Sequence, residues 1–213
     1  MRPKNSKDKV KLTMSVVWPP IIILIVGLSI WYSASHFAGL PRYILPSPEL
    51  ILFEGIEKYD SLLRNGWVTF VEAAAGFTIG VFLAVSVALV LVTWRFMDRG
   101  ASPYLVVGLN VPIVAIAPAV IIWFGFGMTS KIVVAAILTF FPVVIYTLKG
   151  LKVADRREVE LFSVLSASRF KELFKLRVPS SLPFFFASLR VASAAAVLAA
   201  VVAEFIQSSE GLG

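Results

Sequence analysis

Cysteine is absent from this chain of 213 residues, and charged residues make up only 15% of it. Without cysteine the chain can form neither disulfide bonds nor thiolate metal sites. Soluble domains carry about 25% charged residues, whereas hydrophobic residues reach 58% here. A chain with so few charged groups cannot cover its apolar surface in water. We therefore predict an integral membrane protein, with lipid as the solvent for most of the sequence.

Residue types that carry catalysis are equally scarce. The chain has one histidine, His36, and no HExxH pattern. Intramembrane hydrolysis needs a nucleophile with its base, paired carboxylates or a metal. The carboxylates inside apolar runs are Glu72 and Glu204, each near the end of its run, and they would have to meet across two helices. The sequence therefore predicts no enzyme, no catalytic residue and no metal site, and a membrane-embedded enzyme is the disfavoured alternative.

A nucleotide site is also missing. The stretch closest to a P-loop, GFGMTSKI at 125–132, lacks the second glycine and the final Ser or Thr. We therefore expect no cofactor in this chain. If ATP drives its function, the ATP must bind to a partner subunit.

Five apolar runs predict an all-α polytopic helical bundle. A basic tail over 1–14 precedes a first span at 15–33. This run is longer than the apolar core of a signal peptide, about 7–15 residues, so we prefer a retained span to a cleaved leader. An external segment over 34–66 contains an amphipathic helix. Residues 67–213 form the core. Its spans are expected at 67–93, 103–124, 132–148 and 182–206.

The second span contains residues that are unusual in a lipid-facing helix. Gly76 and Gly80 form a GxxxG pair in the second span, which favours close approach of another helix. Glu72, in the same span, is either an interfacial carboxylate or a group on a pathway.

The third span is interrupted. Asn110, Pro112 and Pro118 break its helical pattern, and Trp123 and Phe124 follow. Such breaks often line a cavity. We expect these five residues to line a translocation pathway, with ordinary packing as the alternative.

Lysine and arginine set the expected orientation. Of the 20, fifteen fall in the tail, at 94–102 and at 149–180, four fall at Arg42, Lys58, Arg64 and Lys131, and Arg190 lies inside a span. The excess predicts a cytoplasmic N-terminus and a cytoplasmic 149–180 segment. Because the charges lie between apolar runs, they indicate topology control and not nucleic-acid binding.

The polar stretch at 149–180 separates two spans. Asp155 followed by Glu158 fits a helix N-cap with an acid in the first turn, and Ser168 can cap a second helix. Pro179 is expected to end that helix and Pro183 to restart the chain into the membrane. Two short amphipathic helices at a bend make a knob that can enter a groove. An ordinary solvated loop is the alternative.

This stretch resembles the EAA loop in permease subunits of ABC importers, a pattern of Glu-Ala-Ala, three residues, Gly, nine residues, Ile, one residue and Leu-Pro. Glu160 falls on the Glu, Ser166 on the Gly, Leu176 on the Ile and Val178-Pro179 on the Leu-Pro. The spacing matches throughout. The departures are Leu161-Phe162 for Ala-Ala and Ser166 for Gly.

Other stretches are similar to the nitrate, taurine, alkanesulfonate and thiamine-precursor branch of these permeases. They are LPSP at 45–48, VPIVAIAPAVIIWFGFGMTSKIVVA at 111–135 and LRVASAAAVLAAVVAEFIQSSEGLG at 189–213. The resemblance covers nearly the whole chain. It implies a type I importer fold in which five spans are present and an expected sixth is missing. A truncated, non-transporting remnant or scaffold is the alternative.

The resemblance also implies partners and a location. These are a cytoplasmic ATPase that carries the ATP, a second permease subunit in a homodimer, an external substrate-binding protein and the lipid of the inner membrane. The substrate would be a small organic or inorganic anion or a vitamin precursor. The residues implied in ATPase docking are Glu160, Leu161, Phe162, Leu165, Ser166, Ala167, Ser168, Arg169 and Phe170.

Overall fold

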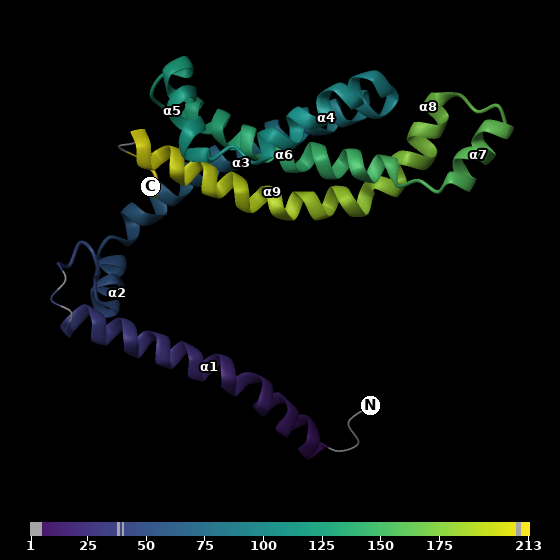
Figure 1. The fold of residues 1–213 in the computed structure, drawn as a ribbon. Coiled ribbons are helices and arrows are strands. Elements are labelled where there is room, and N and C mark those ends of the chain that lie inside the picture. The colour runs from purple at the N-terminus through teal and green to yellow at the C-terminus, as the bar shows by residue number, and fades with distance from the viewer. Residues whose placement is uncertain (1–5, 38, 40, 208–209) are drawn as a thin grey trace. The chain divides into compact units, whose positions relative to one another are not determined.

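The structure is a computed structural model that describes residues 6–37, 39, 41–207 and 210–213, and every described element is helical. The chain divides into two compact units, residues 1–62 and 63–213 (Figure 1). Four helices are long and apolar enough to cross a membrane, and a bent helix pair adds a fifth candidate. The predicted all-α polytopic fold is therefore confirmed.

The first unit contains α1 (Ser6–Phe37) and α2 (Pro48–Glu57). Of the predicted basic tail, residues 1–5 lie outside the described residues and the remainder already belongs to α1. Pro48 opens α2, where its missing amide hydrogen costs little. The Trp31 indole Nε1 donates a hydrogen bond to the Pro46 carbonyl at 3.1 Å, which ties the loop before α2 to α1.

The second unit is built on α3 (Tyr59–Thr93), which continues from the first unit, and α6 (Met128–Lys152). A Cβ on Gly76 would collide with Ala135, and one on Gly80 would lie 2.7 Å from Thr139. Both pairs share the offset of 59 residues that the Glu72–Lys131 contact has. A constant offset means that the two helices run parallel in one register, with glycines at the closest approach.

Helix α9 (Val178–Gln207) runs antiparallel to α6. Gly150, near the end of α6, packs against Ser181 and Phe184 near the start of α9. At the other end, Val134 and Ala135 share a buried cluster with alanines of α9. The buried face of α9 includes a row of small residues at a spacing of four, which ends at a glutamate: Ser188, Ala192, Ala196, Ala200 and then Glu204. Helix α3 has a similar row, which begins at Glu72 and continues through Gly76, Gly80, Ala84 and Ala88.

The predicted third span is two helices. Helix α4 (Arg95–Leu109) and α5 (Ile113–Phe124) meet at an angle of 103° around Asn110–Pro112. Pro112 precedes α5 with an extended backbone, and the residue before a proline disfavours helical geometry. The stretch at 94–102, which lies between two of the predicted spans, forms the N-cap and first half of α4. Its ion pair between Asp98 and Lys152, at 2.6 Å, ties it to α6.

The predicted cytoplasmic loop is mostly helical. It comprises α7 (Arg156–Val164), α8 (Arg169–Glu172) and a π-helical turn, η1 (Leu173–Arg177), that leads directly into α9. The expectation that Pro179 ends a helix is wrong, because α9 begins at Val178 and runs through both Pro179 and Pro183. A proline ring clashes with the carbonyl four residues earlier. The π-helical turn η1 lies directly before Pro179, and the Val178 amide donates to the Leu173 carbonyl five residues earlier.

Candidate functional site

The hairpin formed by α7 and α8 is shaped by its caps. The Asp155 carboxylate accepts a hydrogen bond from the Arg157 amide at 2.9 Å, and the Ser168 hydroxyl accepts one from the Lys171 amide at 3.4 Å. Each cap satisfies an amide that the first turn of its helix leaves without a partner. The sequence therefore identified the start of both helices.

A Schellman motif closes α7. The Ala167 amide donates to the Phe162 carbonyl and the Ser166 amide donates to the Ser163 carbonyl, both at 3.0 Å. Ser166 has φ +51°, in the left-handed region that this motif requires. Serine thus adopts the backbone geometry for which the EAA pattern has glycine, at a cost that glycine would avoid.

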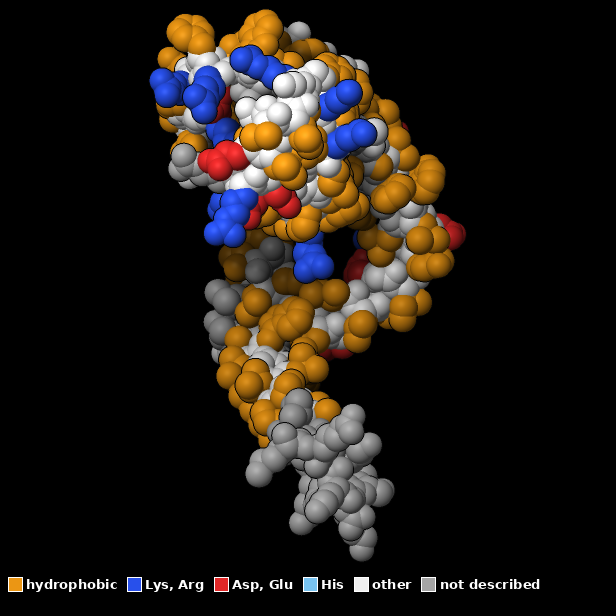
Figure 2. Space-filling model, turned by 90° about the vertical axis from the view of Figure 1, so that its right-hand side faces the viewer, with side chains coloured by type: hydrophobic (Ala, Val, Ile, Leu, Met, Phe, Trp, Pro, Cys, Tyr) orange, Lys and Arg blue, Asp and Glu red, His pale blue; other side chains and the backbone are white. Residues whose placement is uncertain are grey.

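The hairpin exposes apolar side chains. Val164 is 81% exposed and Phe170 is 73% exposed, with Leu161 and Leu165 exposed beside them. Phe162 and Ala167 are half-buried, while Glu160, Ser168 and Arg169 are exposed. Figure 2 looks onto the end of the second unit that carries this hairpin and shows Lys and Arg side chains gathered among hydrophobic ones. Apolar groups inside a basic rim are typical of a protein-binding surface.

The base of the hairpin is firmly anchored. Arg177 forms an ion pair with Glu172 at 2.6 Å and donates a hydrogen bond to the Leu151 carbonyl at 3.2 Å. Leu173 is buried in the core cluster formed by α3, α4, α6 and α9. A force applied to the hairpin therefore reaches the membrane helices directly.

The residues predicted for the pathway lie along the bent α4–α5 pair. Asn110 caps α4 and donates its side-chain amide to the Val106 carbonyl at 2.7 Å. Pro112 precedes α5 and Pro118 lies within it. These three residues are exposed, as are Trp123 and Phe124, whereas α5 packs on α6 and α9 through Ala117 and Val120. All five residues predicted for the pathway are therefore left uncovered by this chain.

The sequence analysis missed a buried polar cluster on α3, α6 and α9, at the end of these helices away from the α7–α8 hairpin. Lys131 of α6 donates to Glu72 Oε1 of α3 at 2.8 Å, and Thr69 of α3 donates to Glu204 Oε1 of α9 at 2.7 Å. Glu204 also lies within hydrogen-bonding reach of the Glu72 carboxyl group. The exposed fractions of Glu72, Glu204 and Lys131 are 0%, 1% and 4%.

This cluster also binds backbone. The Lys131 ammonium donates to the Glu210 carbonyl at 3.2 Å, the Thr69 hydroxyl accepts from the Leu212 amide at 3.0 Å, and Glu204 Oε2 accepts from the Gly213 amide at 2.8 Å. Gly211 has φ +116°, and a Cβ there would collide with the Glu204 carboxylate. Residues 210–213 are thus held against α3, α6 and α9 by buried side chains.

Two expectations are corrected by this cluster. Glu72 is not an interfacial carboxylate, because it is fully buried, and Lys131, counted among the external loop charges, is buried beside it. The two carboxylates, whose meeting across two helices the sequence analysis disfavoured, belong to one cluster. A signal for this was present, since Glu72, Gly76 and Gly80 repeat at a spacing of four, and so do Lys131, Ala135 and Thr139.

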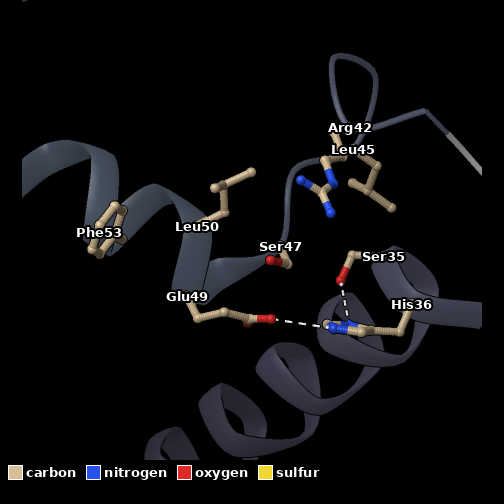
Figure 3. A pocket seen from close by; sticks show the side chains of 8 residues that line it. All are labelled: Ser35, His36, Arg42, Leu45, Ser47, Glu49, Leu50 and Phe53. Atoms are coloured by element: carbon tan, nitrogen blue, oxygen red, sulfur yellow. Dashed lines mark hydrogen bonds and ion pairs between the residues drawn. The ribbon is translucent and has the colours of Figure 1, made fainter.

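The first unit contains a cavity of about 570 Å³ between α1, α2 and their connection (Figure 3). His36 Nε2 lies 3.2 Å from the Glu49 carboxylate, and the His36 ring stacks on Tyr32. A hydrogen bond from its own backbone amide lowers the pKa of Glu49, with further help from Ser47 and His36. His36 therefore joins α1 to α2. Among the described residues, no three His, Cys, Asp or Glu side chains gather as a metal site would require.

Comparison with known proteins identifies the family. The sequence profile described as "Binding-protein-dependent transport system inner membrane component" matches residues 76–213. A probable ABC transporter permease protein of Haemophilus influenzae is 34% identical over 91% of this chain and 79% of its own length. The formylaminopyrimidine transport permease protein ThiX of Halalkalibacterium halodurans is 33% identical over 91% and 78%. The riboflavin transport system permease protein RibX of Chloroflexus aurantiacus is 32% identical over 92% and 75%.

These matches confirm the resemblance to ABC importer permeases, which the sequence analysis found over nearly the whole chain. The family is a transport component and not an enzyme, and membership implies partnership with an ATPase and a substrate-binding protein. The chain belongs to the inner-membrane components of binding-protein-dependent transport systems: it is a multi-pass membrane permease subunit of an ABC importer, in the nitrate, sulfonate and thiamine-precursor branch.

Proposed function

We propose that this permease subunit couples to a cytoplasmic ATPase through the α7–α8 hairpin. The observation that carries this proposal is the set of exposed apolar residues Leu161, Val164, Leu165 and Phe170 on an element with a rigid base. ATP binds to the partner, and closure of the ATPase pair moves the hairpin. Because Leu173 and Arg177 join the hairpin to the core, the movement tilts α6 and α9 together.

The exposed residues of the bent α4–α5 pair support a second permease subunit in a homodimer. Pro118, Trp123 and Phe124 of α5 are all exposed. In a two-subunit assembly, the broken helices would border the pathway between the subunits, with Asn110 at the break, and lipid would cover the remaining apolar surface. The names of two relatives, ThiX and RibX, mention formylaminopyrimidine and riboflavin. We accordingly propose as substrate a small organic or inorganic anion or a vitamin precursor, delivered by an external binding protein.

Co-purification of the ATPase subunit of the same importer tests the docking proposal. We expect Phe170→Ser, and Leu161→Ser combined with Leu165→Ser, to lower the bound ATPase by roughly tenfold or more, as loss of a buried anchor does. The matched control is Phe126→Ser, because Phe126 is 82% exposed in the turn between α5 and α6, at the other end of α6. Undiminished binding by both hairpin variants would refute the proposal.

A further inference from the structure

The buried polar cluster contains more negative than positive groups. Its titratable members are Glu72 from α3, Lys131 from α6 and Glu204 from α9, each at least nine-tenths buried. From the segment after α9, Glu210 contributes its backbone carbonyl, while its side chain is exposed. With every group ionised, the cluster would carry one uncompensated negative charge. Burial of such a charge is strongly unfavourable.

The hydrogen bonds of the cluster lack one donor. Both Glu204 oxygens have donors, from Thr69 and from the Gly213 amide. Glu72 Oε1 accepts from Lys131, but Glu72 Oε2 is buried and has no donor among the described residues. The neighbouring group is the Glu204 carboxyl. Two ionised carboxylates offer only acceptors, so their contact is favourable only with a hydrogen between them.

We propose that this cluster is a proton-binding site in which one proton is held between Glu72 Oε2 and the Glu204 carboxyl group. The proton makes the cluster electrically neutral and supplies the missing donor. A metal cation is a poorer occupant, because it would lie beside the Lys131 ammonium group, which already occupies the position between Glu72 and the Glu210 carbonyl.

Occupancy of this site controls how firmly residues 210–213 are held. Loss of the proton leaves two like charges side by side, and repulsion of Glu204 weakens its bonds to Thr69 and to the Gly213 amide. In the unfolded chain both carboxyl groups are exposed and ionised at neutral pH. The folded protein therefore binds one more proton than the unfolded one, so its stability falls as the pH rises above about 4.3, the ordinary pKa of a glutamate side chain, and stops falling once the folded site has lost its proton.

Infrared spectroscopy of the purified full chain in lipid bilayers tests this proposal. Side-chain 13C labelling of glutamate identifies the carbonyl band of a protonated glutamic acid. We expect one such band at neutral pH in the native protein and its loss in both Glu72→Gln and Glu204→Gln. The control is Glu54→Gln, because Glu54 is a half-exposed partner of Lys58 outside the cluster. This variant should keep the band.

Thermal unfolding across pH supplies a second readout. The native midpoint should fall as the pH rises from about 5 until the site loses its proton, whereas Glu72→Gln, whose amide can donate to Glu204 without a titrating proton, should show little pH dependence. Absence of a protonated glutamic acid in the native protein would overturn the proposal, as would a band that survives in both cluster variants. If sodium ions stabilise the native protein and no such band is present, the site binds a cation and the proposal of a bound proton is wrong. None of these outcomes depends on ATPase docking.

Discussion

Two constraints favour glycine at position 211: its backbone conformation and the lack of room for a side chain. Its φ of +116° suits glycine, and a side chain would enter the volume of the Glu204 carboxylate. We expect Gly211→Ala to destabilise the protein by at least about 1–2 kcal/mol from backbone strain alone. The control is Gly100→Ala, which lies in α4 with open space around it and should stabilise by about 0.5–1 kcal/mol. Thermal unfolding in detergent distinguishes the two, and equal midpoints would argue against the close contact.

Ser166 carries strain of a milder kind. Its left-handed backbone at the end of α7 costs a non-glycine residue about 1 kcal/mol. Ser166→Gly should therefore slow proteolytic cleavage of the hairpin, and Ser166→Val should accelerate it, because a β-branched residue tolerates positive φ poorly. Cleavage rates that rank in the opposite order would mean that the bend does not adopt this geometry.

Sequence reasoning succeeded at the residue scale where the interaction is local. Asp155 and Ser168 cap helices through amides two and three residues away, so the sequence alone identifies them. It failed for Glu72 and Lys131, which are 59 residues apart and meet only when two helices pack. A charged residue read by itself near the end of an apolar run looks interfacial, because the partner that allows its burial is not nearby in the sequence.

At the scale of elements, the contact between α3 and α6 depends on the absence of side chains. Gly76 faces Ala135 and the Ile132 carbonyl so closely that Gly76→Ala would force the helices apart. We expect this variant to lose about 1–3 kcal/mol of stability, as overpacked cores do. Gly27→Ala in α1, where no atom lies within reach of a new methyl group, is the control. If both variants unfold at the native temperature, the helices are not in contact there.

Element boundaries were predicted less well than element existence. The amphipathic helix α2 and the apolar helices were expected, but α4 begins at Arg95, within a stretch rich in charges. Its Asp98 is paired with Lys152 of α6, a contact that makes a polar helix favourable and that the local sequence does not contain. Likewise, α9 runs through Pro179 directly after the π turn η1, and no residue pattern in the sequence predicted that turn.

At the scale of the whole molecule, the absence of cysteine allows a direct test of orientation. The charge count predicts residues 94–102 in the cytoplasm and the loop around Tyr43 outside. A membrane-impermeant maleimide applied to intact cells should label Tyr43→Cys and should label Gly100→Cys only after permeabilisation. Both positions have open surroundings, since Tyr43 is 85% exposed and a Cβ added at Gly100 would meet no other part of the chain within 4 Å. The reverse pattern would invert the topology.

The shared register of α3 and α6 also limits how this protein can change in length during evolution. A residue inserted between Glu72 and Gly80 would turn the row of small residues by about 100° and point it away from α6. An insertion at Asn110–Pro112 or in the turn at 125–127 would change only a connection between helices. Related sequences should accordingly show insertions and deletions at these connections, while the intervals 72–80 and 131–139 keep their length even where their residues differ.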